Sequence, residues 1–186
     1  MTATRYLRAQ AYNNAWSNHR LLRACVSLSA EELSATRTSF FPSIIWTLNH
    51  ILTVDLFYLS GLEGASLGPS AFDPEIPCPD IVDLSERQRA ADLRLIRFCE
   101  NLTDDMLENE VDHLRVDWVQ TEQIDRTLLH LFQHQLHHRG QVHAMLAGTS
   151  VPPPQLDEFY LDHERERALR AADFEALGFT EDRIWR

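Results

Sequence analysis

Four long segments of the chain repeat apolar residues at the spacing of an amphipathic helix. In the first, the apolar positions include Leu7, Ala11, Ala15 and Leu22. Positions separated by three or four residues lie on one face of a helix. The pattern therefore predicts four helices, at about 4–27, 42–61, 80–102 and 125–147. A Ser-Ala-Glu-Glu sequence beginning at Ser29 is a capping box and predicts a short additional helix.

The segments between and after these helices follow other patterns. Gly and Pro recur through 61–79, which predicts a long loop. Apolar and charged residues alternate within 108–120, which predicts a short extended or hairpin segment. Residues 162–170 alternate acidic and basic side chains, as in a solvated helix. We expect Ile184 and Trp185 to pack back onto the body of the protein or onto a partner subunit.

Together these elements predict an all-α fold. We expect an antiparallel four-helix bundle with a short extended insert and a C-terminal tail helix. The 186 residues fit a single domain, with a core at about 4–160 and a charged extension at 161–186. Segment 42–61 is apolar nearly all round, which predicts burial on more than one side. In the last long helix the predicted inward side carries Leu129, Phe132, Leu136 and Val142.

Composition narrows the possible partners. The net charge is -11 and no basic patch is visible, so we expect no nucleic-acid partner. No apolar run approaches the roughly 20 residues needed to span a bilayer, so we expect no membrane partner. The first residues lack the apolar core of a signal peptide, which predicts a cytoplasmic location.

The three cysteines are expected to be reduced thiols, because their number is odd and no C-x-x-C is present. Cys25 and Cys99 lie among apolar helical positions and are expected in the core. Cys78 lies in the Pro-rich loop, where we expect it to be more exposed. None of the three is predicted to be a catalytic thiol.

Histidines are concentrated in the last long helical segment. His130, His134 and His138 are spaced by four residues. In a helix of about 3.6 residues per turn their imidazoles lie along one face, together with Gln141. Two imidazoles one turn apart can bind one metal ion from the same side. Spacing alone leaves a second interpretation open, which is a polar, solvated, histidine-rich face.

A further histidine, His50, lies within the strongly apolar segment 42–61. A buried imidazole needs partners for its ring nitrogens. For an isolated buried histidine these partners are more often hydrogen-bonding groups than a metal ion. The histidine stripe further along the chain favours a ligand role for His50.

Several segments also match one known family. They are Tyr12-Asn-Asn-Ala-Trp-Ser-Asn-His-Arg-Leu-Leu, Ser39-Phe-Phe-Pro-Ser-Ile-Ile-Trp-Thr-Leu-Asn-His-Ile-Leu and His134-Gln-Leu-His-His-Arg-Gly-Gln, followed by Gly148 and Pro152-Pro-Pro-Gln-Leu-Asp. On these residues, which spread over about 12–160, the chain resembles the DinB family, within the DinB/YfiT-like group of proposed metalloenzymes. The combination of H-x-x-x-H-R-G-Q with an upstream Leu-Asn-His is more specific than either motif alone.

The resemblance implies a four-helix bundle that holds a divalent metal, zinc or nickel, through three histidines. By motif match these ligands are His50, His134 and His138. His137 lies between matched ligands and is not assigned a role. The residues expected to support the ligands, by their nearness in the sequence, are His130, Asn49, Gln141 and Asp55.

Three imidazoles leave an open coordination position, which is typical of catalytic rather than structural sites. The resemblance implies a metal-dependent enzyme, since relatives in the wider group include isomerases and S-transferases that use a low-molecular-weight thiol. Hydrolysis by an activated water is an alternative reaction. A second hypothesis is a non-catalytic stress-response protein that binds a metal or a small ligand. A third is a helical interaction module without metal. Because family members often form dimers, a homodimer is also expected.

Overall fold

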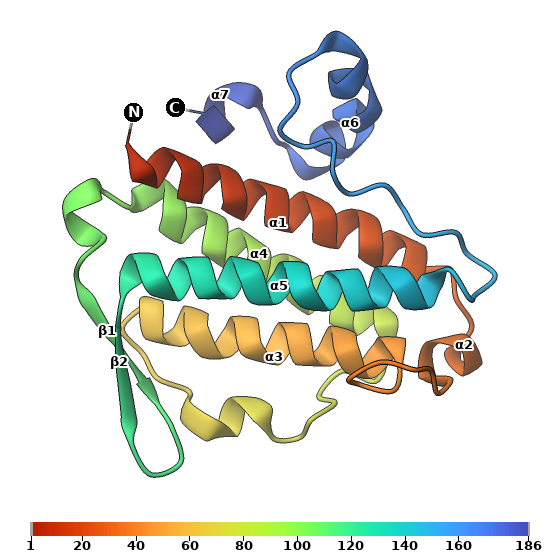
Figure 1. Ribbon diagram of the computed structural model, residues 1–186, viewed down its shortest axis with the longest axis horizontal. Coiled ribbons are helices and arrows are strands. Elements are labelled where there is room, and N and C mark those ends of the chain that lie inside the picture. The colour runs from red at the N-terminus through yellow and green to blue at the C-terminus, as the bar shows by residue number, and fades with distance from the viewer. Residues whose placement is uncertain (1, 186) are drawn as a thin grey trace.

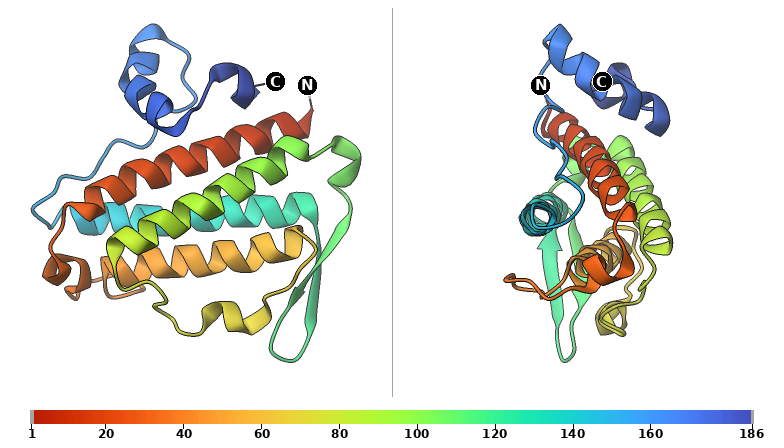
Figure 2. Two further views of the ribbon diagram at one scale, coloured as in Figure 1. Left: turned by 180° about the vertical axis from the view of Figure 1, so that it is seen from behind. Right: turned by 90° about the vertical axis from the view of Figure 1, so that its right-hand side faces the viewer.

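The computed structural model describes residues 2–185, in which four long helices lie side by side (Figure 1). They are α1 (Ala3–Val26), α3 (Ile44–Leu62), α4 (Ile81–Asn101) and α5 (Ile124–Leu146). Helix α1 packs against α4, and α3 packs against α5. Each of these two pairs is antiparallel, whereas α1 and α5 run in one direction and α3 and α4 in the other (Figures 1 and 2). The mostly helical fold that the sequence predicts is confirmed.

Serine side chains fix where two of the helices begin. The short helix α2 (Ala30–Ser34) starts with the predicted capping box, in which Ser29 Oγ accepts from the backbone N–H of Glu32 and the Glu32 carboxylate accepts from that of Ser29. Ser43 caps α3 by accepting from the backbone N–H of Trp46. Helix α3 therefore begins just after Pro42, close to its predicted start.

The long Gly- and Pro-rich connection allows α3 and α4 to run in the same direction, because it returns the chain along the length of α3 (Figure 1). It contains one short 3-10 helix, η1 (Gly68–Phe72). Asn49 of α3 anchors its far end: the side-chain amide donates to the carbonyl of Cys78 and accepts from its N–H, both at 2.8 Å. Cys78 is therefore buried, and the expectation that it is exposed is wrong. Cys25 and Cys99 are buried free thiols, as predicted.

The alternating segment between α4 and α5 forms an antiparallel hairpin. After a 3-10 turn, η2 (Asp104–Met106), strand β1 (Glu110–Leu114) pairs with β2 (Val119–Gln123). This confirms the extended insert. The hairpin packs on the C-terminal end of α3, where the ring of His113 lies directly against Gly61.

Helix α5 buries only part of its predicted side. Phe132 and Val142 are buried as expected, but Leu129 and Leu136 are 58% and 60% exposed. Gln135 and Arg139 are buried in their place and hydrogen-bond to each other at 3.1 Å. A pattern of apolar residues could not reveal this, because the space between the long helices contains a polar network.

Helix α3 is enclosed by its own chain. Helices α4 and α5, together with η1 and β1, pack around it, which confirms burial on more than one side. Because its own chain covers the apolar surface of this helix, that surface gives no support to the expected homodimer, which stays a prediction. No helix within residues 2–185 is both long and apolar enough to cross a membrane.

The C-terminal tail folds back beside α1 as α6 (Glu164–Leu177) and α7 (Glu181–Trp185) (Figure 2). Ile184 is buried and its carbonyl accepts from Nε of Arg8 at 3.2 Å, so its packing onto the body is confirmed. The expectation of a wholly solvated tail helix is wrong at Arg170, which is 2% exposed. Its guanidinium donates to the carbonyls of Glu158 and Leu161.

We expect Gly61→Ala to destabilise the protein. A Cβ at this position would overlap Nδ1 of His113 and lie 3.0 Å from the carbonyl oxygen of Asp112. Overpacking of this kind costs about 1–3 kcal/mol, which exceeds the gain of up to about 1 kcal/mol from replacing a helical glycine. Urea denaturation measures the difference. Gly140→Ala is the matched control, because a Cβ there meets nothing within 4 Å, and it should be neutral or stabilising. Equal effects of the two substitutions would contradict the packing described for the hairpin.

Candidate metal centre

Three histidines from two helices converge at one side of the long helices. Helix α3 supplies His50, and α5 supplies His134 and His138 from successive turns. The Nε2 atoms of His50 and His134 are 3.0 Å apart. One ring nitrogen from each of the three residues can be chosen so that all lie within 4.8 Å of one another. The antiparallel packing of α3 on α5 thus joins residues that are 84 positions apart in the sequence.

The environment keeps these imidazoles neutral at physiological pH. Burial, followed by the charge of His138, lowers the pKa of His50 to about 4. Burial and the neighbouring histidines lower the pKa of His134 to about 3, and burial also lowers the pKa of His138. A histidine must be unprotonated to bind a metal. Two facing Nε2 atoms on neutral rings, with a third ring beside them, are a donor set that fits a divalent cation.

Gln141 fixes the orientation of one of the three rings. Its Oε1 lies 2.9 Å from Nδ1 of His138, and its Nε2 lies 3.1 Å from Nε2 of His137. With Nδ1 of His138 donating to Gln141, Nε2 of that ring is left free to bind. Hydrogen bonds of this kind to the second nitrogen are the usual means of orienting a ligating histidine. Within residues 2–185, Nδ1 of His134 has no such partner.

An aromatic side chain that the sequence reasoning did not single out covers the histidines. The ring of Phe41 lies 4.3 Å from that of His50 and 5.8 Å from that of His138, centroid to centroid. Phe41 comes from the loop between α2 and α3. It belongs to the Ser39-Phe-Phe-Pro segment that carries the family resemblance. The resemblance of this segment was the one sequence feature that could have pointed to Phe41. Its position reduces the access of water to one side of the rings.

Two residues expected beside the ligands have other partners. The ring of His130 is exposed, lies 6.3 Å from that of His134 and packs edge-on against Tyr58. Asn49 donates to the carbonyls of Ile45 and Cys78, so its amide holds the loop rather than a histidine ring.

Asp55, which was also considered as a supporting residue, belongs to a polar network buried between the four long helices. It accepts hydrogen bonds from Gln88 of α4, at 2.6 Å, and from Gln135 of α5. The sequence reasoning missed this network because single polar residues on apolar helices gave no pattern. Its members, drawn from all four long helices, are Asn14, Asn18, Asp55, Gln88, Asp92, Gln135 and Arg139.

The charges of the network are close to balance. Burial raises the pKa of Asp55 to about 7 and that of Asp92 to about 6. Burial also lowers the pKa of the Arg139 guanidinium to about 10, so it stays charged at neutral pH. One cation beside two carboxylates that ionise only partly gives a core with little net charge, which reduces the energetic penalty of burying these groups.

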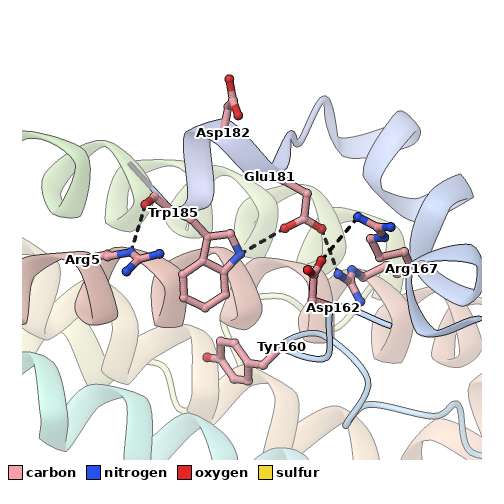
Figure 3. A pocket seen from close by; sticks show the side chains of 8 residues that line it. Arg5, Tyr160, Asp162, Arg167, Glu181, Asp182 and Trp185 are labelled. Atoms are coloured by element: carbon pink, nitrogen blue, oxygen red, sulfur yellow. Dashed lines mark hydrogen bonds and ion pairs between the residues drawn. The ribbon is translucent and has the colours of Figure 1, made fainter. Parts of the chain in front are cut away.

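A separate cleft of about 570 Å³ lies between the N-terminal end of α1 and the tail (Figure 3). Its charged side chains bond mostly to one another: Glu181 accepts from Nε1 of Trp185 and from Arg170, and Arg5 donates to the carbonyl of Trp185. The contact of Arg5 with Trp185 joins the tail to α1, and the other two contacts lie within the tail. The histidine cluster therefore remains the stronger candidate for chemistry.

The fold and the cluster define a mostly helical protein with a candidate three-histidine metal centre. A family model described as "DinB family" matches residues 2–169, and the chain belongs to this family. It is similar to a crystal structure of a DinB-like protein from Bacillus cereus ATCC 10987, with a TM-score of 0.56 and 21% identity over 75% of this chain and 91% of that chain. At this identity the similarity concerns the fold. The comparison with curated proteins finds no match.

We expect Gln141→Met to weaken metal binding by about 10- to 100-fold, because the ring of His138 loses the group that orients it. Competition with a chromophoric chelator measures the affinity for zinc. Gln133→Met is the control, since Gln133 is exposed on the same helix. If both variants bound zinc as tightly as the unmodified protein, Gln141 would have no orienting role.

We expect Asp55→Asn to change how stability depends on pH. The folded-state pKa of Asp55, about 7, lies above its ordinary value of 3.8. This group therefore stabilises the fold most below about pH 4 and loses that contribution as pH rises toward 7. The variant lacks this loss, so its stability relative to the unmodified protein should rise between pH 4 and pH 7. Urea denaturation across this range tests it, with Asp117→Asn as control, because Asp117 is exposed at the turn of the hairpin. A parallel pH profile for Asp55→Asn would contradict the raised pKa.

Proposed function

We propose that this protein is a divalent-metal-dependent enzyme whose metal is held by His50, His134 and His138. The observation that carries the proposal is the convergence of three neutral imidazoles from α3 and α5. Imidazole ligands suit several divalent metals, and the family resemblance favours zinc or nickel, which are the metals we propose. We also infer that the four long helices are a four-helix bundle of the DinB/YfiT type, with the metal centre between two of them.

The residues around the site have separable tasks. The three histidines would bind the metal, Gln141 orients His138, and Phe41 limits the access of water to one side of the cluster. When bound, a divalent metal would lower the pKa of a thiol or a water molecule and so supply a nucleophile near neutral pH.

The number of ligands favours catalysis over storage or sensing. A closed structural site has four protein ligands. Within residues 2–185 the histidine cluster has three members, and His130, the nearest additional histidine on the same stripe, is exposed and packs on Tyr58. A position would thus remain for substrate. This argues against the alternative of a non-catalytic, metal-binding stress-response protein.

A thiol-dependent reaction, S-transfer or isomerisation, is the class we propose. Burial raises the pKa of Cys25 and of Cys99 to about 12, and it also raises the pKa of Cys78. None of these buried thiols is suited to act as a nucleophile at neutral pH. The thiol would therefore come from a low-molecular-weight compound, which is the partner we propose together with a small-molecule substrate.

Metal content tests the first step of this proposal. We expect about one equivalent of zinc or nickel per chain in untagged protein and none in a variant with all three substitutions His50→Ala, His134→Ala and His138→Ala, measured by mass spectrometry after dialysis. His130→Ala is the matched control and should retain the metal, because its ring lies outside the cluster. Full metal content in the triple variant, or none in the unmodified protein after zinc and nickel are added, would remove the basis for a metalloenzyme.

A further inference from the structure

A cleft of about 470 Å³ adjoins the histidine cluster. One wall comes from the end of α5 and the other from the loop between α2 and α3. Its lining residues are Arg37, Thr38, Ser39, Phe40, Gln141, Ala144, Met145 and Gly148. Gln141 belongs both to this lining and to the metal centre, because the same side chain hydrogen-bonds to His138. A molecule in the cleft would therefore lie beside Gln141, next to the residue that holds the ring of His138.

The loop that forms the second wall is a closed unit. The backbone N–H of Arg37 donates to the carbonyl of Pro42 at 2.7 Å. Within this closed loop, Phe41 packs on His50, while neighbouring Phe40 is 79% exposed at the cleft. One loop thus covers the histidines with one aromatic ring and lines the cleft with the residues before it.

Arg37 brings a positive charge to this cleft that no acidic side chain neutralises. One of its Nη atoms donates to the carbonyl of Ala35 at 2.9 Å, and within residues 2–185 the guanidinium forms no ion pair. By contrast, Arg20 pairs with Glu158 and Arg94 pairs with Glu63. The chain has 28 acidic residues against 17 Lys and Arg, so acidic partners are abundant elsewhere. A half-buried guanidinium with donors to spare is suited to bind a carboxylate.

We propose that this cleft binds a carboxylate of the ligand that enters the metal centre, and that Arg37 determines this specificity. The hydroxyls of Thr38 and Ser39, which also line the cleft, can add hydrogen bonds to the same group. The ligand class is a small thiol that carries a carboxylate. This inference rests on the proposed function, because it assumes that the thiol of the same molecule reaches the histidine-bound metal.

Cobalt-substituted protein provides a test that does not depend on activity, because a bound thiol gives a charge-transfer absorption band. The probes are 3-mercaptopropionate and its neutral analogue, 3-mercaptopropionamide. We expect the unmodified protein to bind the carboxylate at least about 10-fold more tightly than the amide, which is the size expected for a charge-assisted hydrogen bond. Arg37→Gln should abolish this preference, and Arg37→Lys should retain part of it.

The matched control is Arg126→Gln, which removes an exposed arginine from the other end of α5 and should leave the preference unchanged. A second arm titrates butyrate by calorimetry in the presence of 2-mercaptoethanol. Binding that Arg37→Gln abolishes would show that the cleft accepts a carboxylate carried by a second substrate, with Arg37 in the same role.

Two different failures can be told apart. If cobalt is bound, but both thiols bind equally and butyrate does not bind, the role of Arg37 is overturned while the metal centre stands. If the protein binds no cobalt, metal analysis shows this before any thiol is added, and the proposed function and this inference are both overturned.

Discussion

The burial of the Arg139 guanidinium constrains the arrangement of the four long helices. Arg139 is 4% exposed and donates to Asn14 and Asn18 of α1 as well as to Gln135 of its own helix. Removing a guanidinium from water costs several kcal/mol unless hydrogen bonds and opposite charges replace the solvent. The opposite charge comes from two carboxylates of the same network, Asp55 of α3 and Asp92 of α4. Each of the four long helices must therefore place a polar group at the same height along their common axis.

This constraint also determines how α5 is rotated. With Gln135 and Arg139 facing inward, Leu129 and Leu136 are turned to the surface. Consecutive residues of a helix differ by about 100° around its axis. His134 and His138, each one residue before a member of the network, therefore lie on the flank that faces α3 rather than at the centre. The polar network and the histidine cluster are thus two results of one helix orientation.

The sequence predicted those features that depend on strong local signals. The long helices, the capping box at Ser29 and the hairpin follow from periodicity and turn chemistry, and the histidine spacing indicated which side chains could meet. The exposure of Leu129 and the burial of Cys78 could not be predicted in this way. Both depend on a hydrogen bond or a network between distant segments, such as the contact of Asn49 with the Cys78 backbone. Phe41 and Arg37 were missed because a loop gives no periodicity.

The charge of the protein affects the two parts of the proposed site, the histidine cluster and the cleft that contains Arg37, in opposite ways. A net charge of -11 favours the approach of a divalent cation and disfavours that of an anion. Neutral imidazoles add no positive charge that would repel the cation, and their low pKa values keep them neutral well below pH 7. An anionic ligand, by contrast, needs a local positive charge to overcome the field of the protein. Within the loop that covers the histidines, Arg37 supplies that charge, so the same few residues can favour a cation at one point and an anion beside it.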